Sequence, residues 1–230
     1  MWRAGATGGR LGRALAALAG ALVVVLALAQ LLLPRLAASR ISSRVGRYGK
    51  VRSVSVSAWP AIELLWGDVG SVHVRAGALA LQPSQVEPLL WEARGTASMR
   101  VSAERVTLGS LAITDAVLEK HGDELGAEGL VSEAAAKVAL PAGLQVQLLG
   151  SSNGRVEVQA SGSLFGVGAS VDAVAGANDG KLVAHPVGFL VSALQLTLYS
   201  NPHVYIEGVA ASVASGSPRS YRLSIWGRLR

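Results

Sequence analysis

The 230-residue sequence contains no cysteine, few aromatic residues (5%) and few charged residues (16%). The absence of cysteine excludes a disulfide-stabilised scaffold, a thiol nucleophile, a zinc–thiolate site and a lipid anchor attached to cysteine. It does not fix the redox compartment, because an exported domain tethered to a membrane can fold without disulfides. With 197 residues after residue 33, the length is typical of one medium-sized domain.

The sequence also lacks the common catalytic motifs. It has no G-x-S-x-G elbow, no H-E-x-x-H pair and no phosphate-binding Gly-Lys-Ser/Thr. The histidines are far apart, so a metal site would need a cluster that only the fold could create. The carboxylates are also scattered along strand-like segments, which gives no acid–base pair. We therefore predict a protein that is not an enzyme and has no cofactor or metal. The histidines are His73, His121, His185 and His203, and the carboxylates considered are Glu63, Asp68, Glu104, Asp115 and Glu157.

The net charge of +6 is concentrated at the N-terminal end. Residues 1–52 contain nine basic residues and no acidic one, whereas the remaining residues contain 12 basic and 15 acidic residues. The basic surplus therefore flanks the apolar N-terminal stretch, where it would meet anionic lipid headgroups. A folded region without a basic surplus argues against nucleic acid as a partner.

Residues 14–33 form an uninterrupted apolar stretch whose only strongly polar side chain is Gln30. As a helix these 20 residues would span roughly 30 Å, the thickness of bilayer hydrocarbon. The stretch is longer than the core of a cleaved signal peptide, so we predict a transmembrane anchor or uncleaved signal, preceded by a basic cytoplasmic N-terminus over residues 1–13. The distribution of basic residues alone would leave the domain in the cytoplasm, whereas the N-terminal position of the span argues for export.

A basic amphipathic helix is predicted over residues 34–50. Apolar side chains recur along one helical face, and basic side chains follow i, i+4 and i+7 spacing on another. Two readings remain open: a solvated linker helix, or a helix that lies on headgroups or packs its apolar face into the domain. The apolar residues are Leu36, Ile41, Val45 and Tyr48, and the basic residues are Arg40, Arg44 and Arg47.

Residues 51–230 are predicted to form one β-rich domain. Asn153-Gly154 is a strong hairpin signal in a four-stranded antiparallel meander, which the later strands are expected to continue. One helix is expected over Gly129–Leu140, with Ser132 as its cap. The predicted fold class is α+β: a long, curved, mainly antiparallel β-sheet wrapped around one or two helices, with an apolar face left open as a lipid-binding groove. The meander strands are Leu144–Leu149, Arg155–Ala160, Val167–Ala175 and Lys181–Val187.

Three of the five tryptophans lie in Pro- and Leu-rich segments that we expect to form short helical turns. Such tryptophans commonly pack in a core, and the alternative is that they line the mouth of an apolar groove or enter the membrane interface. The candidate lipid-binding residues are Trp59, Ile62, Leu65, Trp66 and Trp91, together with Arg40, Arg44 and Arg47 for the headgroup.

Six segments between roughly residues 35 and 228 share a recognisable pattern. They are the Arg- and Ala-rich helix, Val54-Ser55-Val56, Trp59-Pro60 with Leu64-Leu65 and Gly67, Val72-His73-Val74, Gly180–Pro186 and Leu223–Gly227. Together these segments resemble the LmeA-like phospholipid-binding proteins of actinobacterial cell envelopes. Ala58-Trp59 stands where that family more often has Gly-Phe before the proline.

The resemblance implies an extracytoplasmic, membrane-anchored domain that binds phospholipid and supports envelope lipid or lipoglycan homeostasis without catalysis. The partner would be a membrane phospholipid, with the basic residues favouring an anionic one. The competing hypothesis is a non-catalytic structural or interaction domain of an envelope assembly, whose apolar face is covered by a partner protein.

Overall fold

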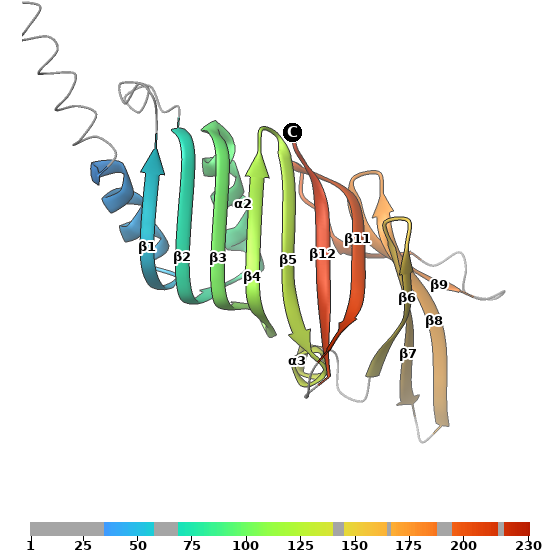
Figure 1. Ribbon diagram of the computed structural model, residues 1–230. Helices are drawn as coiled ribbons and strands as arrows, with labels where there is room; N and C mark the ends of the chain where they lie inside the picture. Colours follow the sequence, from blue (N-terminus) through green and yellow to red (C-terminus); the bar gives the residue numbers. More distant parts are fainter. Residues whose placement is uncertain (1–34, 58–68, 140–144, 165–166, 188–194, 216–218) are drawn as a thin grey trace, which may run out of the picture.

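The computed structural model of the chain consists of two open β-sheets and a few short helices (Figure 1). None of the helices in the described ranges has the length and apolar character needed to cross a bilayer. The predicted span over residues 14–33 lies outside those ranges. The structure describes residues 35–57, 69–139, 145–164, 167–187, 195–215 and 219–230.

The larger sheet has seven strands. All neighbours are antiparallel except β2 and β3, which run parallel and are connected by helix α2 (Pro83–Glu92) and a short 3-10 turn (Ala93–Gly95). In spatial order its strands are β1 (Gly49–Ser57), β2 (Val69–Leu81), β3 (Thr96–Leu108), β4 (Leu111–His121), β5 (Glu124–Ser132), β12 (Ser220–Leu229) and β11 (Val204–Ala214).

The smaller sheet has five antiparallel strands, and its hairpins form where the sequence predicts them. In the first of these turns, φ is 51° at Asn153 and 73° at Gly154. In the second, φ is 48° at Asp179 and 75° at Gly180. Positive φ at both central residues suits the tight turns that follow strand twist, which is why Asn-Gly and Asp-Gly are favoured there. In spatial order the strands are β10 (Leu196–Tyr199), β9 (Lys181–Val187), β8 (Val167–Asn178), β7 (Arg155–Leu164) and β6 (Gln145–Ser152).

The fold class is therefore confirmed as α+β with open, mainly antiparallel sheets, but the expectation of one continuous sheet was wrong. Strands β11 and β12 do not continue the meander. Instead, β12 pairs with β5, as in Tyr221 opposite Val131, and β11 pairs with β12. These pairings join segments distant in sequence, so local periodicity cannot predict them.

The two sheets meet where β11, the edge of the larger sheet, contacts the hairpin ends of the smaller one. The Ile206 N–H donates to the carbonyl of Gly180 (3.0 Å), and the Val209 N–H donates to that of Gly154 (3.1 Å). The Ala211 N–H donates to Ser151 Oγ (3.0 Å). These bonds satisfy donors that an edge strand would otherwise expose, so the smaller sheet closes this edge.

Two helices lie on the same face of the larger sheet. A helix over residues 35–45 runs antiparallel to β1, since Ala38 packs near Val56 and Val72 while Val45 packs near Ala76 and Leu79. Helix α2 covers the next strands, where Leu90 packs against Leu125 and Leu229 in a buried cluster. On β2, Val72 and Val74 both point toward this face, because side chains two residues apart lie on the same side of a strand.

The sequence predicts a helix over Gly129–Leu140, and the structure places only its second half in one. Residues up to Ser132 belong to β5, and helix α3 runs from Glu133 to Ala139. The i, i+4 apolar spacing fits a helix, but β5 is hydrogen-bonded to β4 on one side and β12 on the other, and this pairing outweighs local preference. Ser132 does cap the helix: its Oγ accepts from the Ala135 N–H (3.1 Å).

The opposite face of the larger sheet is polar and carries exposed ion pairs between strands. Because all these side chains are solvated, the pairs contribute little stability, about 0–1 kcal/mol each. Their main consequence is to keep this face hydrated, so the apolar face with the two helices is the one available for an apolar ligand. The pairs are Arg52–Glu104, Arg100–Glu119, Arg222–Glu128 and Arg228–Glu207.

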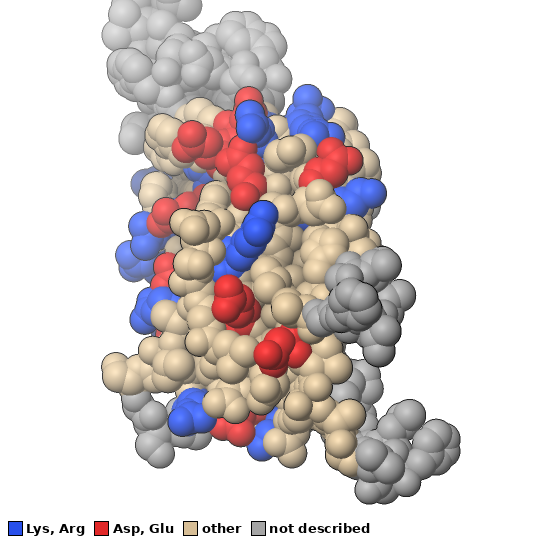
Figure 2. All heavy atoms as spheres, turned by 90° about the vertical axis from the view of Figure 1, so that its right-hand side faces the viewer, with Lys and Arg blue, Asp and Glu red and all other residues tan. Residues whose placement is uncertain are grey.

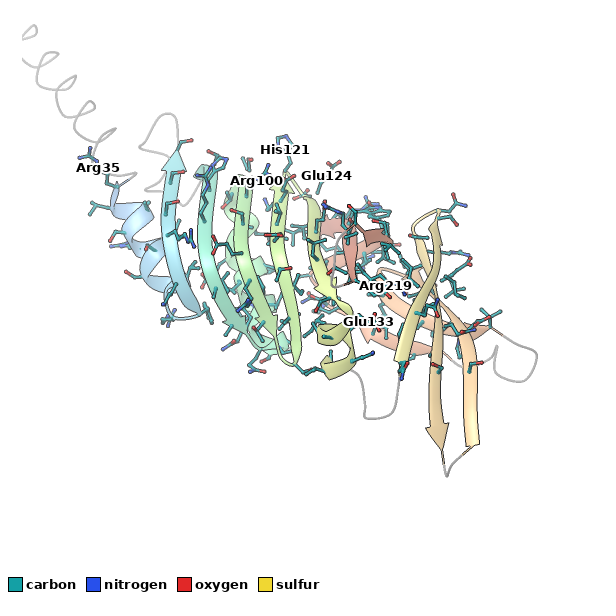
Figure 3. The ribbon with its side chains drawn as sticks, turned by 60° about the horizontal axis from the view of Figure 1, so that its bottom comes forward. Arg35, Arg100, His121, Glu124, Glu133 and Arg219 are labelled. Carbon is teal, nitrogen blue, oxygen red and sulfur yellow. The ribbon has the colours of Figure 1, made fainter. Side chains whose placement is uncertain are left out.

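Helix 35–45 begins at the end of the sheet that also carries the β4–β5 turn and the C-terminal residues (Figures 1 and 3). The Leu229 N–H donates to the carbonyl of Asp123 there (2.8 Å). Figure 3 labels Arg35, His121 and Glu124 at this end, and Glu133 and Arg219 at the other.

The sheet junction gives a first testable prediction. A Cβ added to Gly180 would lie 2.4 Å from Tyr205 Cδ2, and the residue has φ of +75°. We expect Gly180→Ala to lower the free energy of unfolding by about 2 kcal/mol or more, from left-handed strain and overpacking together. Gly126→Ala is the matched control, because no atom lies within 4 Å of its added Cβ. Urea unfolding measures both, and equal losses would contradict the described junction.

Candidate functional site

The two helices enclose a groove of about 940 Å³ above the sheet. Helix 35–45 forms one wall, α2 the other, and β2, β3 and β4 the floor. This volume lies within the usual range of about 300–1,000 Å³ for small-molecule sites. The floor residues include Val72, Val74, Leu79, Met99, Val101 and Leu118, and the walls include Ala37, Ile41, Val45, Val86, Leu89, Leu90 and Ala93.

Most of the lining is apolar, with 14 of the 21 lining residues, because each element turns its apolar side to the groove. Val86, Leu89 and Leu90 of α2 and Ala93 just after it follow i, i+3, i+4 and i+7 spacing, the pattern of a single apolar helix face. Our sequence analysis expected only short helical turns in this region and missed the full helix. The available signals were this spacing and the capping box before it, in which the Gln82 N–H donates to Gln85 Oε1 (2.8 Å).

The charged side chains that line the groove come from its two walls. Arg44 Nη1 of helix 35–45 donates to Glu92 Oε2 of α2 (2.7 Å), which joins the two walls across the opening. Arg40 also lines the groove. Arg47 follows the helix in an exposed turn and does not line the groove. Two of the three predicted headgroup arginines therefore lie at the groove, each beside aliphatic lining.

Trp91 lies in helix α2 rather than in the expected turn, and it faces away from the groove that its neighbours Leu90 and Glu92 line. The indole is 47% exposed. Its ring centroid lies 4.4 Å from that of His203, and the Arg94 guanidinium lies 4.6 Å from its centre. The other four predicted apolar site residues, Trp59, Ile62, Leu65 and Trp66, lie outside the described residues.

Lys120 is the one buried basic side chain among the described residues, with 3% exposure. Its Nζ donates to the carbonyl of Thr96 and, at 3.5 Å, to that of Arg94. These carbonyls lie just beyond the C-terminal end of α2, where the helix dipole favours a cation. Burial lowers the pKa of Lys120 below its ordinary value of 10.5, and the negative charge of Asp123 partly offsets this shift. Lys120 thus holds the end of the α2 wall.

No group of three or more potential metal-ligating side chains occurs within the described ranges. The four histidines come from β2, the end of β4, β9 and the segment before β11. What the fold and site define together is an α+β open-sheet domain with one apolar, half-open groove.

Comparisons with protein-family models, with curated proteins and with solved structures found no match to this chain. The chemistry of the site is therefore argued from its own geometry.

The Arg44–Glu92 contact gives a second prediction. Both side chains are more than half exposed (60% and 53%), so water screens the pair. A double-mutant cycle with Arg44→Gln and Glu92→Gln should give a coupling free energy below about 1 kcal/mol in urea unfolding, decreasing as salt is added. Such a weak link would let the two walls separate easily. A coupling of several kcal/mol that salt does not reduce would contradict this description.

Lys120 gives a third prediction. The pKa of Lys120 is lower in the folded chain than in the unfolded chain, where it is about 10.5. Between these two pKa values the unfolded chain binds more protons than the folded chain, so the free energy of unfolding should increase with pH over that range. Lys120→Met removes this titration. The free energy of unfolding of the wild type, minus that of Lys120→Met, should therefore increase as pH rises toward 10.5 in urea titrations. A difference that decreases over this range would show a raised pKa instead.

Proposed function

We propose that this chain is a lipid-binding module that holds the acyl part of a phospholipid in the groove between helix 35–45 and α2. The observation that carries the proposal is the groove itself, about 940 Å³ with mostly apolar walls and floor. Apolar surface contributes about 25 cal/mol per Å² removed from water, whatever the detailed shape of the ligand. An acyl chain therefore suits this lining better than a polar metabolite would.

The rim supports a phospholipid rather than a plain hydrocarbon. Arg40 and Arg44 lie where an acyl chain would leave the groove. Guanidinium groups bind phosphate well, because their planar donors match its oxygens. Glu92 already holds Arg44, but weakly, so a lipid phosphate can compete for it. The preference is therefore for an anionic headgroup.

The cellular setting belongs to the same proposal. The apolar stretch at residues 14–33 directly precedes helix 35–45 and supports an anchored protein. The resemblance to LmeA-like proteins favours the extracytoplasmic side of the membrane and a role in envelope lipid or lipoglycan homeostasis. No step of this role requires catalysis by the chain.

One observation favours the competing function, a structural domain covered by a partner protein. The five-stranded sheet exposes large apolar side chains. Figure 2 views the molecule from this side and shows a mostly uncharged face with a few separate charged side chains. Exposed apolar patches often mark interaction surfaces. The residues are Leu149, Val171, Val187, Leu196 and Leu198, each at least 40% exposed.

A groove-filling substitution tests the lipid-binding proposal. Met99 is half-buried on β3 and lines the floor. We expect Met99→Trp to occupy part of the cavity and to weaken binding of a fluorescent acyl-chain phospholipid by at least about tenfold, whereas Met99→Leu should bind like wild type because it keeps a similar volume. Binding is followed by fluorescence titration of the full chain in detergent, with circular dichroism to check folding. Equal affinity in both variants would contradict lipid binding in this groove.

A further inference from the structure

The flank of the molecule beside the groove is unusually basic. Residues 35–57 contain six basic residues and no acidic one, and all six are exposed. We call the surface formed by helix 35–45 and the start of β1 the basic flank. It lies at the margin of the seven-stranded sheet, since β2 is the only partner of β1 among the described strands (Figure 1). Its basic residues are Arg35, Arg40, Arg44, Arg47, Lys50 and Arg52.

Only two of these cations are neutralised by carboxylates in the described structure. Arg44 pairs with Glu92 of α2, and Arg52 pairs with Glu104 of β3. The other four have no carboxylate partner among the described residues, so the flank carries a local surplus of positive charge. They are Arg35, Arg40, Arg47 and Lys50.

The basic flank also exposes an apolar side chain beside its cations. Leu36 is 61% exposed on helix 35–45, although Ala37, Ala38 and Ile41 of the same helix pack onto the sheet. An exposed apolar side chain among cations that have no carboxylate partner in the described structure is one feature of helices that lie in the interface of a bilayer. The apolar stretch at residues 14–33 leads directly into this helix, which would hold the flank within a few residues of a membrane.

We propose that the basic flank docks on the surface of a bilayer that contains anionic phospholipid. Arg35, Arg40, Arg47 and Lys50 contact the headgroups, and Leu36 enters the interface. Docking goes beyond acyl-chain binding, because the flank can dock whether or not the groove is filled. Since Arg40 belongs to both the flank and the groove, a docked domain has its groove opening beside the headgroups, so a lipid moves only a short distance to enter it.

The absence of cysteine makes a site-specific test straightforward. Ser43→Cys places one fluorescent label on helix 35–45, at an exposed position that also borders the groove, and Ser170→Cys places one on the five-stranded sheet as a position control. The full chain is reconstituted into bilayers of phosphatidylcholine, or of phosphatidylcholine with roughly one-third phosphatidylglycerol, each containing a headgroup-linked nitroxide quencher. We expect strong quenching at position 43 only in the anionic bilayer, and little at position 170 in either.

Charge variants then test the cause. Arg47→Gln/Lys50→Gln removes two flank cations that do not line the groove, and Arg75→Gln/Arg105→Gln removes two exposed cations from β2 and β3. With about fivefold per basic residue near an anionic surface, the first pair should reduce the ratio of docked to undocked protein about 25-fold. The second pair should leave it close to wild type. Equal effects of the two pairs, or quenching independent of phosphatidylglycerol, would overturn the proposal.

Repeating the quenching with Met99→Trp separates docking from groove binding. Quenching of the Ser43 label should persist in this variant, since docking needs no lipid in the groove. Loss of quenching with Met99→Trp, with circular dichroism unchanged, would show that the label reports groove lipid and would refute docking. If the wild type docks on the anionic bilayer but does not bind the fluorescent phospholipid in the titration, only the lipid-binding proposal is refuted.

Discussion

The packing of two separate helices on one apolar sheet face is the constraint on which the rest of the structure depends. Helix 35–45 buries Ala38 and Ile41 against the strands, and α2 buries Leu90 against Leu125 and Leu229. Among the contacts described, the ion pair between Arg44 and Glu92 is what joins these helices across the opening. Among the described residues, the floor between them is therefore left partly uncovered. In most domains a third element would fill such a space, because exposed apolar surface is costly. Here the uncovered floor is what gives the chain a binding site.

The remaining architecture supports this open arrangement. The opposite sheet face is solvated and carries the exposed ion pairs, so it does not compete for an apolar ligand. The smaller sheet closes the β11 edge through bonds such as Ile206 N–H to the Gly180 carbonyl, which leaves β1 as the other margin among the described strands. Lys120 fixes the end of α2 through main-chain carbonyls. The groove opening and the basic flank are therefore neighbours, and the segment that precedes helix 35–45 joins the molecule on the same flank.

Local features of this fold could be predicted from the sequence, and non-local ones could not. Asn153-Gly154 places a hairpin, and Ser132 caps a helix, because each depends on a few adjacent residues. The partners of β12 depend on contacts such as Tyr221 with Val131, for which no local signal exists. The same limit applies to the site. Arg44 was expected to face headgroups, but its contact with Glu92, 48 residues away, became visible only in the structure. The α2 wall was missed because Pro88 interrupts an otherwise regular helical pattern.

Photo-crosslinking of the full chain with a phospholipid that carries a diazirine on its acyl chain tests the central claim most directly. A lipid held between the helices should modify peptides from helix 35–45, from α2 and from the part of β3 around Met99, because these elements line the groove. Modification should decrease when unlabelled phospholipid is added in excess. Crosslinks confined to the five-stranded sheet, or modification that unlabelled lipid does not displace, would contradict the account.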